Sequence, residues 1–155
     1  MLEYQYGRGE ITLQSADPKI PPMIANRFCE DERDLSRLVS CYQDALAFTT
    51  QKPLSDIITQ IRFPDPMRST KTEDLANLCR KFSGSGFHPC GTLKMGNDLM
   101  SVVDQLGRVR HTDNLVIADA SIMPFVPSAN INLTCIMIGE RIGEWIRIQP
   151  ATYGL

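Results

Sequence analysis

The feature that most restricts the fold is a histidine followed at once by a proline in the second half of the chain. His88 precedes Pro89, and a residue before proline is held in extended backbone. Gly91 permits a turn directly afterwards, so residues 87–95 are expected to be extended chain with one turn. Histidine is the side chain that most readily exchanges a proton near neutral pH. His88 is therefore a candidate general base, although a single histidine is also a common structural hydrogen-bonding group.

Two further polar positions follow downstream, each beside an apolar segment. The continuous apolar run at residues 115–118 predicts a strand buried on both faces, and it ends in Asp119. Asn130 and Asn132 then precede an apolar helix expected over about residues 132–148, and either amide is a candidate N-cap. A helix start presents unpaired N–H groups and the positive end of the helix dipole. Such a site suits an electron-accepting ring whose carbonyl gains negative charge on reduction, whereas simple capping or a turn would explain the same residues structurally.

The first half of the chain reads as strand and helix separated by prolines. Alternation predicts a strand over residues 9–15, and helical spacing after the acidic Asp31 predicts the next element. A short helix is expected after Pro53 and another helix from Thr72. Breaks are expected at Pro64 and Pro66. The predicted fold class is α+β, with a mixed or antiparallel sheet packed with three or four helices.

Composition excludes several classes of protein. The chain has 155 residues, 43% hydrophobic and 22% charged residues, and a formal net charge of −2. The sequence has no stripe of Lys and Arg residues of the kind that forms a nucleic-acid surface. No apolar run approaches the roughly 18 residues of a membrane span. The N-terminus shows no apolar signal core, and the 5 cysteines are odd in number without a Cys-x-x-Cys pair. We therefore expect reduced thiols, no metal site and a cytoplasmic location.

The ordered motifs together resemble the C-terminal portion of the glucose-methanol-choline (GMC) flavoprotein oxidoreductases. The resemblance runs over about residues 7–147 and has mild departures, such as Ala129 where the family frequently has glycine. The matching segments are His88-Pro89-x-Gly91-Thr92-x-x-Met95-Gly96, residues 102–104, residues 115–124, Pro127-Ser128-x-Asn130-x-Asn132 and residues 136–141.

The resemblance implies FAD as the cofactor and a CH–OH group of a small alcohol as the substrate. It places the catalytic histidine at His88 and the second active-site position at Asn132. Hydride would pass to the flavin while His88 acts as acid/base and Asn132 orients the oxygen. It also implies cofactor contacts at Asp119, Ala120, Asn130, Ile131 and Asn132.

The family's N-terminal Gly-x-Gly-x-x-Gly strand–turn–helix, which cradles the FAD pyrophosphate, has no counterpart in the sequence. Residues 1–155 are thus expected to be the substrate-binding domain alone, with the FAD-binding Rossmann part absent. We expect the isolated chain to bind flavin weakly or not at all and to be inactive without a separate FAD-binding half. Two alternatives stay open: a hydroxynitrile lyase-like flavoprotein fragment that keeps FAD as a structural element, and a non-catalytic truncated remnant.

Overall fold

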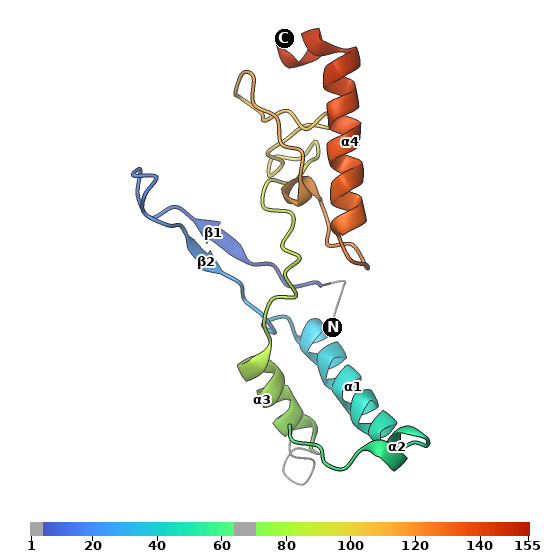
Figure 1. Ribbon diagram of the computed structural model, residues 1–155. Helices are drawn as coiled ribbons and strands as arrows, with labels where there is room; N and C mark the ends of the chain where they lie inside the picture. Colours follow the sequence, from blue (N-terminus) through green and yellow to red (C-terminus); the bar gives the residue numbers. More distant parts are fainter. Residues whose placement is uncertain (1–4, 64–70) are drawn as a thin grey trace. The chain divides into compact units, whose positions relative to one another are not determined.

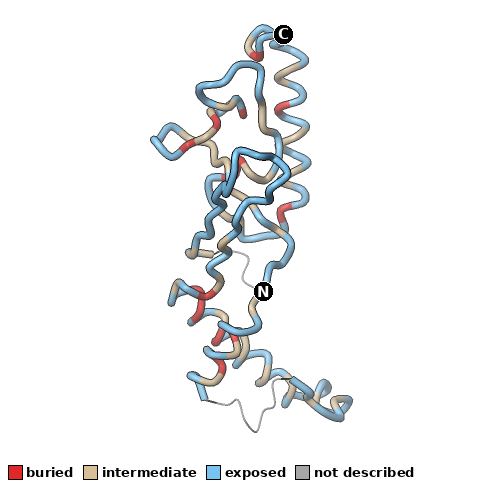
Figure 2. Tube along the Cα trace, turned by 90° about the vertical axis from the view of Figure 1, so that its left-hand side faces the viewer, coloured by how far each residue is buried: buried red, intermediate tan, exposed pale blue. Residues whose placement is uncertain are grey.

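The computed structural model describes residues 5–63 and 71–155, so the expected breaks at Pro64 and Pro66 lie outside the described residues. The chain divides into two compact units, Met1–Gly84 and Ser85–Leu155. Each unit has its own buried cluster of apolar side chains, which appear as separate red stretches of the trace in Figure 2. Each unit is described by itself below.

The first unit begins with a two-stranded antiparallel sheet. Strands β1 (Glu10–Thr12) and β2 (Met23–Ala25) pair so that Ile11 lies opposite Ile24 (Figure 1). The expected strand over residues 9–15 is therefore present but shorter. Ile11 is 50% exposed and Ile24 59% exposed, so within the described part of the first unit one face of the hairpin is apolar and about half exposed.

The described residues of the first unit also form three helices, as the sequence predicts. They are α1 (Glu32–Thr49), α2 (Leu54–Ile57) and α3 (Thr72–Phe82), and α1 packs against α3. Asp31 is the N-cap of α1, and its carboxylate accepts the N–H of Arg33 at 2.9 Å. The Arg33 guanidinium also donates to this carboxylate and lowers the pKa of Asp31 to about 2. The acid noticed in the sequence thus starts the helix. The core between α1 and α3 consists of Cys29, Leu35, Val39, Leu75 and Cys79.

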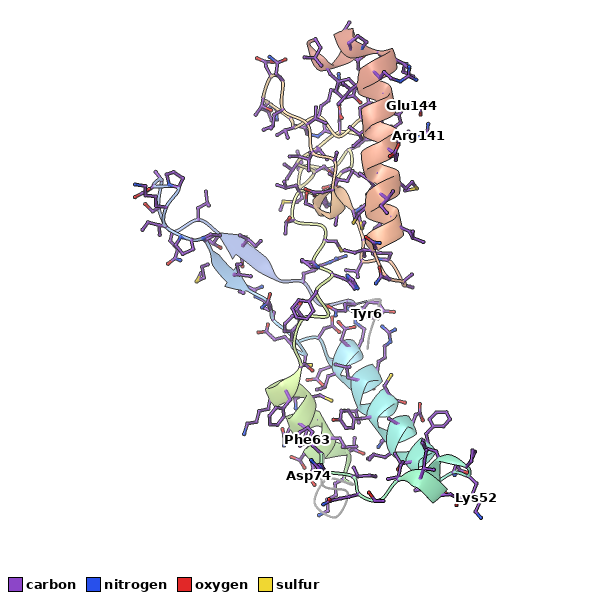
Figure 3. All side chains as sticks on the ribbon, viewed as in Figure 1. Tyr6, Lys52, Phe63, Asp74, Arg141 and Glu144 are labelled. Atoms are coloured by element: carbon purple, nitrogen blue, oxygen red, sulfur yellow. The ribbon has the colours of Figure 1, made fainter. Side chains whose placement is uncertain are left out.

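A buried carboxylate fastens the start of the described chain to α1. Asp34 is only 6% exposed, and it accepts the N–H of Tyr6 at 2.9 Å and that of Gly7 at 2.7 Å. The Arg33 guanidinium lies 4.1 Å from the centre of the Tyr6 ring, which Figure 3 labels beside α1. Charge-assisted bonds from two backbone N–H groups replace the water that Asp34 loses on burial.

The second unit is built around helix α4 (Asn132–Ile148), with two short 3₁₀ helices, η1 (Ala120–Ile122) and η2 (Pro150–Tyr153). Its core joins Val103, Ile122 and Ile142, of which Val103 is fully buried. Ile142 belongs to α4, whose inner face packs on the loops that precede it in the chain (Figure 1). The helix predicted for residues 132–148 is confirmed at both ends.

The extended segments of this unit pair one residue at a time. Within the described residues of 85–155, only isolated bridges form: Met95 with Val103, Val103 with Val109, and Arg108 with Val116. The prediction of a buried strand at residues 115–118 is wrong, because Val116 and Ile117 are partly exposed and Leu115 and Ala118 are exposed. Closely spaced turns interrupt the chain on both sides, so few consecutive residues are free to form a ladder. The fold class is nonetheless the predicted one, α+β, with an antiparallel sheet and four α-helices among residues 5–63 and 71–155.

The segment that carries His88 is anchored to η1 rather than to a neighbouring strand. Gly91 N–H donates to Ala120 O at 3.1 Å, Leu93 N–H to Ser121 O at 2.9 Å, and Met95 N–H to Ile122 O at 2.8 Å. Residues 87–95 were expected to be extended with a turn at Gly91. The structure shows Gly91 at φ +80° and, in addition, Phe87 at φ +62°. Backbone hydrogen bonds to three successive residues of η1 therefore fix the loop.

None of the described helices is long and apolar enough to cross a membrane.

We predict that Asp34→Ala destabilises the first unit by about 1–3 kcal/mol, because two partly buried N–H groups lose their acceptor. Urea denaturation followed by circular dichroism measures the change. Asp44→Ala, at an exposed position of the same helix, is the matched control and should be nearly neutral. Equal effects of the two variants would contradict the role of Asp34.

We predict that Gly91→Ala destabilises the second unit by about 1–2 kcal/mol, because the backbone at φ +80° disfavours a side chain. The added Cβ would also lie 3.0 Å from Met123 O. Gly84→Ala is the control, since a Cβ there meets nothing within 4 Å. Thermal unfolding of both variants gives the comparison, and an unchanged midpoint for Gly91→Ala would show that the turn tolerates a side chain.

Candidate functional site

The structure brings His88 together with a carboxamide at the start of α4. The Nε2 atom of His88 lies 2.9 Å from the Nδ2 atom of Asn130. His88 is partly exposed and Asn130 is exposed, so the pair is accessible from solvent. Both residues belong to the unit Ser85–Leu155 although they are far apart in sequence. A base candidate and an amide that can bind oxygen therefore share one location.

The partner of His88 differs from the one expected. The sequence suggested that the carboxamide of Asn132 shares the site with His88, but the side chain that reaches the ring is that of Asn130. Asn132 contributes its backbone N–H, which donates to Oδ1 of Asn130 at 2.9 Å. Asn132 itself is exposed, and its carboxamide makes no hydrogen bond to another described residue. The proposed catalytic role of the Asn132 side chain stays a prediction.

The start of α4 leaves open donors beside this pair. The N-cap residue is Ile131, which is 7% exposed and makes no side-chain cap, so neither asparagine is the N-cap that the sequence suggested. The carbonyl of Ile131 accepts the N–H of Cys135 at 2.9 Å. Within the described residues, the N–H groups of Leu133 and Thr134 find no acceptor. Together with the helix dipole, these groups can stabilise a partial negative charge on a bound molecule.

Ala120 anchors the His88 loop, and Asp119 caps the 3₁₀ helix η1 to which Ala120 belongs. Asp119 is the N-cap of η1, where its Oδ1 accepts the N–H of Ser121 at 2.7 Å and also the Ser121 hydroxyl. The carbonyl of Ala120 accepts the N–H of Gly91 at 3.1 Å. Both were singled out as cofactor contacts, which stays a prediction. The position of Ala120 as an anchor of the loop carries no signal in the sequence, since any residue has a backbone carbonyl.

An ion pair secures the far end of the same loop. Nζ of Lys94 lies 2.9 Å from Oδ2 of Asp98. The hydrogen bond from Lys94 holds the pKa of Asp98 below its usual value, helped by the Met100 N–H. Asp98 Oδ2 also accepts the hydroxyl of Ser101 at 3.0 Å. These contacts close the turn that follows the His88 segment.

The outer face of α4 has no partner within its own unit, residues 85–155. Leu133 is 77% exposed and Met137 60% exposed, although both are large and apolar. A Cβ added at Gly139 or Gly143 would meet nothing within 4 Å, so the helix backbone is open there. A shallow hollow on this helix is lined by Met137, Gly139, Glu140, Arg141, Gly143, Glu144 and Arg147. Figure 3 shows Arg141 and Glu144 beside each other on α4, and their side chains form an ion pair of 3.0 Å.

Comparison with known proteins identifies the family. The family model for GMC oxidoreductase matches residues 5–139. The oxygen-dependent choline dehydrogenase of Escherichia coli O139:H28 (strain E24377A / ETEC) is 38% identical over 147 residues, which cover 93% of this chain and 26% of that protein. The protein of the same name from Escherichia coli K12 is 37% identical over 147 residues, with the same coverage.

Solved structures show the same fold. Pyridoxine 4-oxidase from Mesorbium loti aligns with a TM-score of 0.86 at 22% identity, over 95% of this chain and 28% of that one. An FAD-dependent oxidoreductase from Chaetomium thermophilum aligns with a TM-score of 0.87 at 23% identity, over 96% of this chain and 26% of that one. The chain thus spans about a quarter of the length of the proteins that it matches. It belongs to the GMC oxidoreductase family and corresponds to the family's C-terminal domain.

Proposed function

We propose that the chain is the C-terminal, substrate-binding part of an FAD-dependent oxidoreductase that acts on the CH–OH group of a small alcohol. The contact of 2.9 Å between His88 Nε2 and Asn130 Nδ2 at the start of α4 is the observation that carries the proposal. It puts His88, which can accept the proton of a substrate hydroxyl, beside Asn130, which can donate a hydrogen bond to the oxygen of that hydroxyl. Membership of the family supports the reaction class, and one of its structural neighbours is named as FAD-dependent.

His88 acts as the acid/base in this proposal. A substrate hydroxyl that replaces the direct hydrogen bond between Asn130 and His88 would donate to Nε2 of the ring and accept from Nδ2 of the amide. Transfer of the hydroxyl proton breaks the O–H bond, forms an N–H bond on His88 and leaves the electron pair on oxygen. That oxygen then accepts hydrogen bonds from both side chains, which stabilises its developing negative charge. Asn130 thus takes the orienting role that the resemblance assigns to Asn132.

The residues at the start of α4 fit the proposed cofactor. A bound FAD would supply the acceptor for the hydride that leaves the carbon carrying the hydroxyl. The open N–H groups of Leu133 and Thr134, at the positive end of α4, suit a ring carbonyl that gains negative charge. Asp119, Ala120, Asn130, Ile131 and Asn132 remain the proposed cofactor contacts.

The FAD-binding part of a GMC flavoprotein is the partner proposed for the outer face of α4. The proteins that this chain matches are about four times as long as the matched region, so about three quarters of each lies outside that region. The exposed Ile136 and Met137 offer apolar area, and the bare backbone at Gly139 and Gly143 permits close approach of another element. The isolated chain would accordingly bind FAD weakly or not at all and would be inactive.

We predict that His88→Ala lowers the rate of flavin reduction by about 10²–10⁴-fold, the usual contribution of a general base. The chain is combined with the FAD-binding part of a GMC dehydrogenase that lacks its own C-terminal region, and anaerobic bleaching of the flavin by alcohol is followed. His111→Ala, in an exposed turn, is the control. Full activity of His88→Ala would remove His88 from the mechanism, and turnover without bleaching would favour a lyase over an oxidoreductase.

We predict that Gly143→Gln raises the thermal stability of the isolated chain but weakens its assembly with the FAD-binding part by at least tenfold. Replacing a helical glycine that faces open space stabilises the helix by up to about 1 kcal/mol, whereas the longer side chain would occupy the proposed contact. Gly143→Ala gives a similar helix gain with little added bulk and serves as the matched control.

FAD is titrated into the isolated chain and into a mixture of the chain with the FAD-binding part. Flavin fluorescence then measures how strongly the two parts assemble. Equal flavin binding with glutamine and with alanine at this position would show that the face is not the docking surface. Submicromolar FAD binding by the chain alone would contradict the need for a partner.

A further inference from the structure

We propose that Asn130 has a second role as a positioning residue: it holds the neutral His88 ring in the tautomer that has its proton on Nδ1 and an unprotonated Nε2, whose electron pair accepts the N–H of Asn130. The tautomer follows from the hydrogen-bond network alone, while its catalytic consequence rests on the function proposed above. A base that must receive a proton at Nε2 needs this tautomer before the substrate arrives.

The orientation of the Asn130 amide is the first step. A carboxamide has an oxygen that accepts and a nitrogen that donates, and the two ends are otherwise interchangeable in shape. The backbone N–H of Asn132 lies 2.9 Å from Oδ1 of Asn130 and can only donate. The end of the amide that faces α4 must therefore be the oxygen, which leaves the nitrogen to face His88.

The state of the His88 ring is the second step. Nδ2 of Asn130 carries two hydrogens and no electron pair that accepts, so its contact of 2.9 Å requires an acceptor at Nε2. A neutral imidazole has one N–H, which must then be on Nδ1. The opposite tautomer would set two donors against each other.

The two ends of this network are held by separate parts of the unit. Buried Ile131 fixes the first turn of α4, and its carbonyl accepts the N–H of Cys135. The loop with His88 is fixed at Gly91, whose N–H donates to Ala120 O at 3.1 Å. A change of tautomer would require the amide to turn over, which would set Nδ2 against the N–H of Asn132. The start of α4 therefore specifies the tautomer through one side chain.

Nitrogen NMR of the histidine-labelled chain, residues 1–155, tests the tautomer without FAD or substrate. At a mildly alkaline pH, we expect the His88 signals to show a protonated Nδ1 and an unprotonated Nε2 in long-range proton–nitrogen spectra. His111, exposed in a turn, supplies the reference for a ring that contacts mainly water. A His88 ring protonated at Nε2, or a mixture equal to that of His111, would overturn the proposal.

Asn130→Asp is the decisive variant because it preserves the bond to α4 and reverses the group that faces the ring. One carboxylate oxygen still accepts the N–H of Asn132, and the other now accepts from the ring, so we expect His88 to carry its proton on Nε2. Asn132→Ala keeps the backbone donor and should leave the wild-type tautomer unchanged. Unchanged nitrogen signals in Asn130→Asp, with helical content retained, would contradict the proposal, as would a changed tautomer in Asn132→Ala.

Activity separates this inference from the proposed function. In the flavin-loaded assembly, we expect Asn130→Asp to lower the rate of flavin reduction by at least about 10²-fold, since Nε2 no longer offers an electron pair. The expected NMR signals without any effect of His88→Ala on that rate would support the tautomer and reject the proposed function. A loss of rate in His88→Ala, together with NMR signals that show Nε2 protonated in the unsubstituted chain, would support the proposed function and reject the tautomer.

Discussion

The hydrogen bond between the backbone N–H of Asn132 and the side chain of Asn130 is the contact on which the site depends. It joins a fixed donor, the first turn of α4, to a side chain that could otherwise rotate freely in solvent. The other end of that side chain lies 2.9 Å from Nε2 of His88. A backbone group thereby controls the chemistry of a ring that is far away in sequence, because amide and imidazole each have distinct donor and acceptor atoms.

The second unit holds this site with turns and caps rather than with a sheet. The carbonyls of η1 accept three N–H groups from the segment that follows His88, and Asp119 in turn caps η1. Fully buried Val103 packs with Ile122 and with Ile142 of α4, so the loops and the helix share one core. Loops supply functional side chains in many proteins when a rigid element fixes them, and here α4 and η1 are those elements.

Large apolar side chains remain exposed in both units. Ile24 in β2 and Met137 in α4 are examples, with exposed fractions of 59% and 60%. The chain also spans only about a quarter of the proteins that it matches. Exposed apolar area of this kind marks interaction surfaces. It fits a domain whose proposed function needs the FAD-binding part of a GMC flavoprotein on the outer face of α4.

The sequence by itself determined the helices, the family and the set of candidate residues. Helical spacing predicted α1, α3 and α4, and the acidic cap Asp31 marked the start of α1, because local periodicity and capping depend on neighbours within a few residues. The apolar run at residues 115–118 was misleading, since strand formation depends on partners elsewhere in the chain, and the turns around it leave only an isolated bridge.

The tertiary structure alone decided which amide meets His88. Asn130 and Asn132 are identical in type and two residues apart, so no local pattern distinguishes them. Where α4 begins sets the direction of each side chain, and the packing of the His88 loop on η1 sets the position of the ring. These two placements bring the carboxamide of Asn130 to Nε2 and leave that of Asn132 in solvent.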